Sequence, residues 1–251
     1  MDWTDDGIVL SARKHGESAA VATLLTATHG RHAGLVRGGA GRTQRGVLQP
    51  GNLVRAHWSA RLEEHLGSWK LELLGSPVAG VLDDALRLAV LSGACAVADA
   101  VLPEREAHSA VYAGLRALLE NIERGDCCAA YVRWEITVLA DLGYGLDLSS
   151  CAATGRPEGL AFVSPRTGRA VSQSAGEPYR DRLLPLPLFL SSAESAPSPS
   201  DIRQGMDLTA FFLERHVLAP HGRGLPPARQ RLVERLTRFS ESSLEAHSKA
   251  L

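Results

Sequence analysis

A glycine- and arginine-rich stretch at positions 37–46 has the composition of a loop that approaches phosphate groups. A nucleotide-binding P-loop has the pattern G-x-x-x-x-G-K-[ST], because its lysine and hydroxyl must reach the phosphates and magnesium. Gly41 and Gly46 have this spacing, but Val47 and Leu48 follow them. The stretch is therefore predicted either as a flexible loop between strands or as an arm whose arginines reach nucleic-acid phosphates. The sequence leaves both readings open.

The segment around this stretch is strongly basic, although the whole chain has a net charge of −1. Between positions 13 and 61 there are eight basic residues and one acid, Glu17, which gives a net charge of +7. Such an array neutralises phosphates and releases counterions, so it predicts salt-dependent DNA binding with little sequence preference. The predicted DNA-binding residues are Arg13, Lys14, Arg31, Arg37, Arg42, Arg45, Arg55 and Arg61.

The sequence offers little for catalysis, since it has neither a G-x-S-x-G nor an H-E-x-x-H motif. His216 and His221 lie near a predicted helix end, where a capping or surface role is favoured over metal binding. Cys127 and Cys128 are adjacent on a predicted helix, so both thiols cannot face one ion. We therefore predict no catalytic residues, no metal site and no enzymatic activity. An active site within residues 145–190 remains an open alternative.

The composition is that of a globular protein, with 45% hydrophobic and 22% charged residues. The N-terminus is acidic and no apolar run approaches about 18 residues, so we expect neither a secretory signal nor a membrane span. The four cysteines are too sparse for a disulfide framework, which is typical of a reducing compartment. The predicted location is the cytoplasm, in association with the nucleoid.

The first 75 residues have the pattern of β structure. Apolar and polar residues alternate strictly from Leu53 to Leu62, and again around Trp69, which is typical of half-buried strands. This alternation places Trp58 and Trp69 inward and leaves Trp3 as the one loose aromatic side chain near the basic segment. Strands are expected at about 5–13, 18–28, 31–38, 52–62 and 66–74, and five short strands suit a small closed barrel.

After Pro77 the apolar period changes from two to about 3.6, which predicts helices. We expect them at about 81–102, 104–122, 127–142, 201–218 and 226–239, with an irregular segment at about 145–200. The predicted domains are 1–77, a β-barrel, and 78–251, a helical domain with an irregular insertion. A second basic cluster either extends a DNA path or solubilises the last helix: Arg223, Arg229, Arg231, Arg235 and Arg238.

Short motifs follow one another along the chain in an order that identifies a family. The first group is Gly7-Ile8-Val9-Leu10, Gly16-Glu17-Ser18, Thr28-His29-Gly30-Arg31, Val36-Arg37-Gly38-Gly39 and Leu48-Gln49-Pro50-Gly51. The second group is Cys151-Ala152-Ala153-Thr154-Gly155, Gly176-Glu177-Pro178-Tyr179 and Phe211-Phe212-Leu213-Glu214-Arg215. In order and spacing they resemble the RecO family, and the resemblance covers nearly the whole chain.

The resemblance implies an α+β fold, with an N-terminal OB-fold barrel, a helical body and an insertion that binds zinc in many members. This sequence departs from the family at the metal site, because Cys151 is the one cysteine left of the expected four. Thr154, Ser172 and Ala175 stand at the other positions. We therefore predict a zinc-finger-like but metal-free insertion and no cofactor.

The resemblance also implies function and partners. It implies binding to single- and double-stranded DNA, annealing of complementary strands, and cooperation with RecR in loading the RecA recombinase. The resemblance implies that the recombinase is loaded onto DNA already coated with single-strand-binding protein, whose C-terminal tail docks on the helical body. We predict a recombination mediator in DNA repair. The alternative is an OB-fold RNA-binding or ribosome-associated module, which has the same electrostatics and which an annealing assay on DNA and RNA separates.

Overall fold

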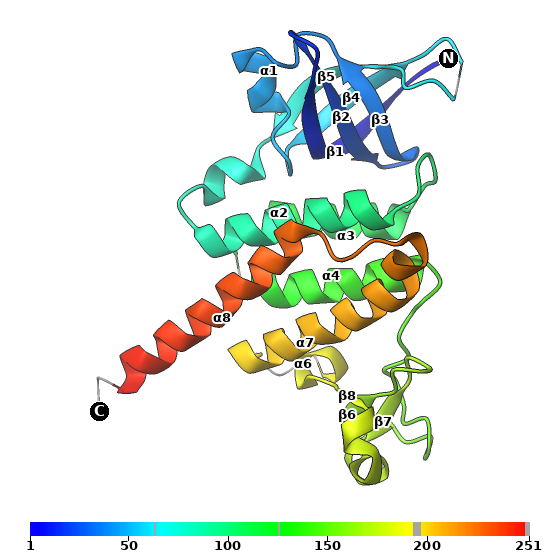
Figure 1. The fold of residues 1–251 in the computed structure, drawn as a ribbon, viewed down its shortest axis with the longest axis vertical. Helices are drawn as coiled ribbons and strands as arrows, with labels where there is room; N and C mark the ends of the chain where they lie inside the picture. The colour runs from blue at the N-terminus through cyan, green and yellow to red at the C-terminus, as the bar shows by residue number, and fades with distance from the viewer. Residues whose placement is uncertain (63, 125, 193–196, 249–251) are drawn as a thin grey trace. The chain divides into compact units, whose positions relative to one another are not determined.

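The computed structural model describes residues 1–62, 64–124, 126–192 and 197–248. The chain forms two compact units: one holds Met1–Cys127 with Pro226–Arg229, and the other holds Cys128–Leu225 with the chain from Gln230 onward. The first unit contains a β-barrel and helices, and the second contains helices and a small sheet (Figure 1). This arrangement confirms the predicted α+β class, with strands first and helices after them.

The barrel is closed and has the strand order β1-β2-β3-β5-β4. Its strands are β1 (Asp2–His15), β2 (Ala19–Thr26), β3 (Gly30–Val36), β4 (Leu53–Ser59) and β5 (Ser68–Gly75). Neighbours pair antiparallel except β3 and β5, whose short parallel contact joins Leu35 to Ser68 and Val36 to Trp69. Five strands closed in this way form an OB-type barrel. All five predicted strands are confirmed.

The barrel interior follows the predicted alternation along β4 but not to the end of β5, where Leu73, also predicted to face inward, is 44% exposed. Val54, Ala56 and Trp58 of β4 are buried, as is Trp69 of β5. Leu62, which the alternation placed inward, is instead 48% exposed. The prediction was wrong there because β4 ends at Ser59, and beyond a strand the period of two no longer sets which way a side chain points.

Side-chain caps and tertiary contacts set the residues at which the helices after the barrel begin. The helices of the first unit are η1 (Pro77–Val81), α2 (Ala85–Val101) and α3 (Ser109–Glu120). The carboxylate of Asp84 accepts hydrogen bonds from the N–H groups of Leu86 and Arg87, both at 3.0 Å, so it caps α2. The predicted start at residue 81 was therefore four residues early.

Residues 104–106 pack on the barrel and do not open α3 as predicted. The N–H of Arg105 donates to the carbonyl of Arg31 at 2.8 Å, and Glu104 forms a parallel bridge with Arg31. A Cβ on Gly30 would lie 1.8 Å from the carbonyl oxygen of Glu106, so only glycine permits this approach. Tertiary pairing with β3 therefore overrides the local helical pattern, and α3 starts at Ser109.

The second unit consists of helices and a three-stranded sheet in the order β7-β6-β8. Its elements from the N-terminal side are α4 (Cys127–Asp141), β6 (Leu160–Val163), β7 (Ala170–Ser172), α5 (Gln173–Gly176), η2 (Glu177–Arg182), β8 (Leu184–Pro185) and α6 (Leu188–Ser191). Then come α7 (Pro199–Phe212), the π-helical η3 (Leu213–Leu218), η4 (Ala219–His221) and α8 (Pro227–Ser248). The insertion predicted as irregular thus contains a sheet, and its residues 193–196 lie outside the described ranges. None of the helices in the described part of the chain has both the length and the apolar character that a membrane crossing requires.

Candidate nucleic-acid interface

A short helix, α1 (Arg42–Val47), lies between β3 and β4, where the sequence predicted a loop. The buried Asn52 holds its C-terminal end, because Nδ2 donates to the carbonyls of Gly46 (2.8 Å) and Val47 (3.1 Å). A helix leaves such carbonyls without partners inside the helix itself. The hydroxyl of Ser76 donates to Oδ1 of Asn52 at 2.8 Å. One buried amide therefore fixes α1 to the barrel.

The chain enters α1 through Gly39, which is buried against β2. A Cβ at this position would lie 2.7 Å from the Cβ of Ala20, so a larger residue would push the connection away from the strand. The N–H of Ala40 donates to the carbonyl of Ser18 at 3.0 Å. The basic residues of this connection are consequently carried on an anchored segment.

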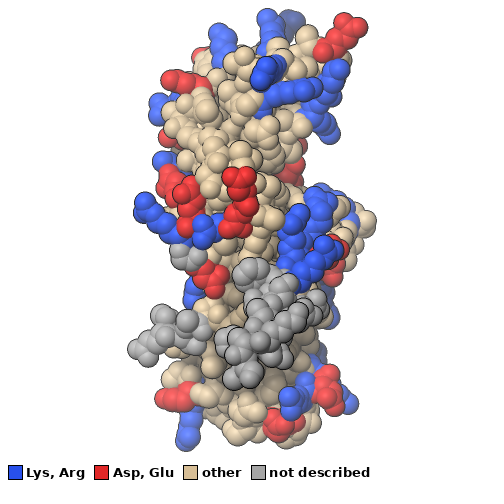
Figure 2. Space-filling view, turned by 90° about the vertical axis from the view of Figure 1, so that its left-hand side faces the viewer, with Lys and Arg blue, Asp and Glu red and all other residues tan. Residues whose placement is uncertain are grey.

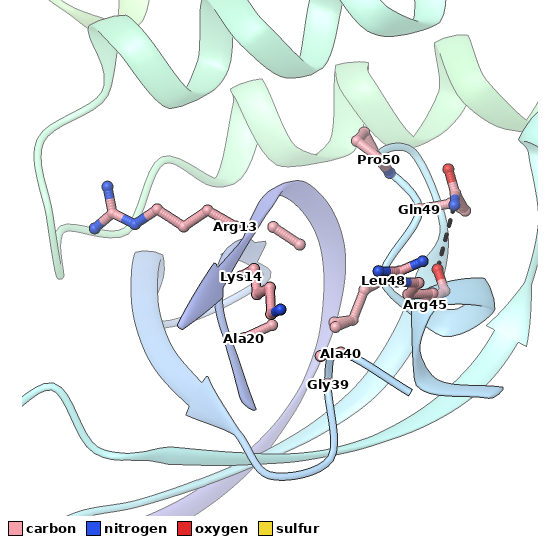
Figure 3. A pocket seen from close by; sticks show the side chains of 10 residues that line it. Arg13, Lys14, Ala20, Gly39, Ala40, Arg45, Leu48, Gln49 and Pro50 are labelled. Atoms are coloured by element: carbon pink, nitrogen blue, oxygen red, sulfur yellow. Dashed lines mark hydrogen bonds between the residues drawn. The ribbon is translucent and has the colours of Figure 1, made fainter. Parts of the chain in front are cut away.

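Basic side chains of β1 and α1 line a first pocket of about 310 Å³. Lys14 and Arg45 both lie at this pocket, whereas the guanidinium of Arg13 extends away from it (Figure 3). Successive strand residues point to opposite faces, which explains why Arg13 and Lys14 diverge. The pocket thus joins cations from two elements that are about 30 residues apart in sequence.

A second pocket, of about 470 Å³, also includes a residue of α1 in its lining. It is lined by Arg37, Lys70 of β5 and Gln44 of α1. Gln44 and Arg45 are neighbours in α1, so this helix contributes to both pockets. Lys70 was absent from the predicted set because it lies beyond the basic run. Its position on the polar side of the alternation around Trp69 was the signal that could have found it.

Two of the predicted DNA-binding arginines are engaged inside the first unit. Nε of Arg31 donates to the carbonyl of Leu102 at 2.7 Å, and its other nitrogens lie 3.3 Å from Asp99 and 3.5 Å from Glu104. With its side chain only 18% exposed, Arg31 joins the barrel to the segment after α2. We therefore leave it out of the interface.

Arg55 is the second engaged arginine, since its Nε donates to the carboxylate of Asp6 at 2.5 Å. Its side chain stays 52% exposed, but its charge is balanced by that of Asp6. Arg42 and Arg61 are exposed and line neither pocket. Of the eight predicted residues, the structure thus brings Arg13, Lys14, Arg37 and Arg45 to the pockets beside α1.

Six basic residues at or beside α1 share a second property: none has a carboxylate partner among the described residues. We call them the basic face: Arg13, Lys14, Arg37, Arg42, Arg45 and Lys70. Figure 2 shows Lys and Arg side chains gathered over the barrel. A phosphate can bind these cations without first breaking a salt bridge within the protein. This arrangement therefore suits a polyanion.

The aromatic residues of the barrel do not add a stacking surface. Trp58 and Trp69 are buried, as predicted. Trp3, predicted to be loose, is half-buried and stacks on His29, with ring centroids 3.9 Å apart and planes 3° from parallel. Its edge contacts with His32 and Trp69 hold it further. Binding of single strands by stacking requires exposed aromatic rings, so the basic face offers charge and no aromatic stacking surface.

Comparison with known proteins identifies the family. Residues 1–76 match the family described as Recombination protein O N terminal, and residues 82–224 match Recombination protein O C terminal. The chain belongs to the RecO family. These matches support a role in DNA repair and recombination, and neither family description names a catalytic activity.

Curated relatives agree with the family matches over nearly their full length. The chain is 53% identical to the DNA repair protein RecO of Rhodospirillum rubrum, over 96% of this chain and 98% of that protein. It is 55% identical to the protein of the same name from Rhodospirillum centenum, over 97% and 98%. It is 49% identical to that of Caulobacter vibrioides, over 94% and 98%. Their shared name favours DNA over the RNA-binding alternative.

Thr154 and Ser172 contact Cys151 at the zinc position of the family, but the chemistry of these side chains does not fit the metal. Sγ of Cys151 donates to the hydroxyl of Ser172 at 3.4 Å and accepts the N–H of Ser172 at 3.2 Å. Burial raises the pKa of this thiol, but hydrogen bonds from Ser172 and Thr154 outweigh it and lower the pKa to about 6. Structural zinc takes four nitrogen, sulfur or carboxylate ligands, and Ala175 supplies none. In the described ranges no three His, Cys, Asp or Glu side chains are grouped to hold a metal ion. The metal-free insertion stays a prediction.

Proposed function

We propose that this RecO-family chain captures DNA strands on the basic face and promotes their annealing during repair. The observation that supports this proposal is the group of six cations at or beside α1, none of which has a carboxylate partner in the part of the chain that the structure describes, on a helix that Asn52 anchors. These cations contact phosphates and not the edges of the bases. The chain therefore accepts single- and double-stranded DNA of any sequence.

Annealing needs no covalent chemistry. Two complementary strands repel each other through their phosphates, and a surface that neutralises one strand lowers this repulsion while base pairs form. The protein supplies charge and proximity, and the base pairs supply the free energy. A non-enzymatic protein is therefore sufficient for the reaction, and DNA binding of this kind associates the chain with the nucleoid.

The mediator role extends this proposal to proteins. We propose that the chain acts with RecR to help load the recombinase onto DNA coated with single-strand-binding protein, and that the C-terminal tail of the coating protein binds the helical body. Membership of the RecO family supports this part. Titration of a labelled tail peptide with the full chain, in the presence and absence of RecR, tests it, and lack of binding to both partners contradicts it.

The annealing experiment uses complementary oligonucleotides, one of them labelled, with the wild type and with Arg37→Ala/Arg42→Ala/Arg45→Ala. We expect the wild type to accelerate annealing and the triple variant to accelerate it less. Since all three substituted side chains are exposed or line a pocket, the variant keeps its fold, which circular dichroism checks. If the variant anneals as well as the wild type, the DNA path lies elsewhere, and the C-terminal arginines are tested next.

A further inference from the structure

The pocket that holds Lys14 and Arg45 has an interior unlike its rim. Its cations stand at the edge, whereas Ala12, Ala20, Gly39, Ala40, Leu48 and Pro50 form the rest of the lining together with Gln49. Ala20 and Leu48 are each only 4% exposed, so this part of the pocket reaches the barrel core. Its volume of about 310 Å³ lies at the lower end of the range of ligand pockets, about 300–1,000 Å³.

A phosphate does not suit the apolar part of this pocket, because the backbone N–H groups of Gly39, Ala40 and Leu48 are already in use. The N–H groups of Gly39, Ala40 and Leu48 donate to carbonyls of the same chain at 3.2, 3.0 and 2.9 Å. Pro50 has no N–H to offer. A phosphate in the interior would lose its hydration without gaining hydrogen bonds, which is costly for a charged group. The rim suits phosphates, and the interior suits a flat, weakly polar group.

A nucleobase has both properties that the pocket requires. Its faces are apolar enough to lie against alanine and leucine side chains, and its edge carries hydrogen-bond donors. Gln49 stands at the rim with Nε2 donating to the carbonyl of Arg45 at 3.3 Å, so its Oε1 can accept from such an edge (Figure 3). The phosphates on either side of that base would then lie beside Lys14 and Arg45.

We propose that this pocket receives one unpaired base of single-stranded DNA while Lys14 and Arg45 hold the flanking phosphates. The inference rests on the proposed DNA binding and adds strand selectivity to it. A base within a duplex is stacked and paired, and extracting it costs a few kcal/mol, so duplex DNA reaches the rim alone. Base pairing withdraws the base from the pocket, which weakens the hold on the annealed product and favours its release.

The test compares an oligonucleotide with an abasic strand of equal length, which has the same phosphates and no bases. Wild type is expected to bind the intact strand about fivefold more tightly, because burying about 40 Å² of base surface against the apolar lining favours binding. Ala12→Phe fills the pocket from an exposed position without changing charge. We expect it to bind the intact strand only as tightly as the abasic strand, with its affinity for the abasic strand and for duplex unchanged.

Thr43→Phe is the matched control, since Thr43 is exposed on α1 and lines neither pocket. It should keep the preference of the wild type for the intact strand. Equal binding of the two strands by the wild type, with a steep salt dependence, overturns the base pocket and leaves the electrostatic function intact. A loss of abasic-strand affinity in Ala12→Phe also overturns it. If the wild type binds neither strand, the proposed function fails together with the pocket.

Discussion

Removing cations of the basic face should change the salt dependence of DNA binding by an amount that the structure sets. Five cations belong to residues that line the two pockets, with the guanidinium of Arg13 extending outward: Arg13, Lys14, Arg37, Arg45 and Lys70. If each neutralises one phosphate of a single strand, the slope of log K against log salt is about −3.5, at about −0.7 per contact. Affinity then falls roughly 100-fold between about 50 and 200 mM salt.

The perturbation is Lys14→Ala/Arg37→Ala/Arg45→Ala, which leaves two of the five cations. The expected slope is about −1.4, and the loss of affinity over the same salt range shrinks to roughly sevenfold. Fluorescence anisotropy with a labelled single strand, repeated at several salt concentrations, measures both slopes. The slope is more informative than one affinity, because it counts the phosphates that are contacted.

A second triple variant, Arg169→Ala/Arg180→Ala/Arg203→Ala, is the control for net charge. Each of these arginines is exposed, lies in the second unit and pairs with a carboxylate, that of Asp147, Glu177 or Asp207. Its slope should equal that of the wild type, although it loses the same three charges. The reasoning is refuted if both triple variants lower the slope equally, since net charge alone would then govern binding.

Three further predictions concern the free energy of unfolding, its pH dependence and the absence of zinc from the insertion. Asn52→Ala leaves the carbonyls at the end of α1 without their partner, so the free energy of unfolding in urea should fall by about 1–3 kcal/mol. Gln49→Ala, which removes an exposed side chain, should change this free energy little. An equal effect of both substitutions contradicts the anchoring role of Asn52. Burial, with the nearby charge of Arg105, lowers the pKa of His32 from 6.5 to about 4. As the pH drops from 6.5 towards 4, the unfolded chain takes up this proton before the folded chain does, so the free energy of unfolding should fall over this range. His32→Phe should flatten this pH dependence of the free energy of unfolding. A variant with the same pH dependence as the wild type contradicts the assignment to His32. Chelation with EDTA should leave the melting temperature unchanged, and a drop that zinc reverses would show that the insertion holds a metal.

The strand periodicity alone was enough to predict the barrel. Alternating burial in β4 follows directly from the geometry of a strand, so the inward positions of Val54, Ala56 and Trp58 could be predicted from sequence. The helices were predictable for the same kind of reason, and both ends of α4 were close to the predicted 127–142, but the starts of α2 and α3 were not predicted. The start of α3 depends on the hydrogen bond from the backbone N–H of Arg105 to the carbonyl of Arg31. These residues are far apart in the sequence, and no local pattern encodes their contact.

The sequence by itself determined that a basic segment lies within the first 61 residues and that its family is RecO. Which of its arginines are available was decided only by the tertiary structure. Arg31 and Arg45 are alike in the sequence, but folding places carboxylates and a carbonyl around Arg31 and leaves Arg45 at a pocket with Lys14. Barrel closure likewise brings Lys70 beside Arg37 from a segment that the charge pattern excluded. Charge composition is a local property, whereas the pairing of a charge depends on residues that only the folded chain brings together.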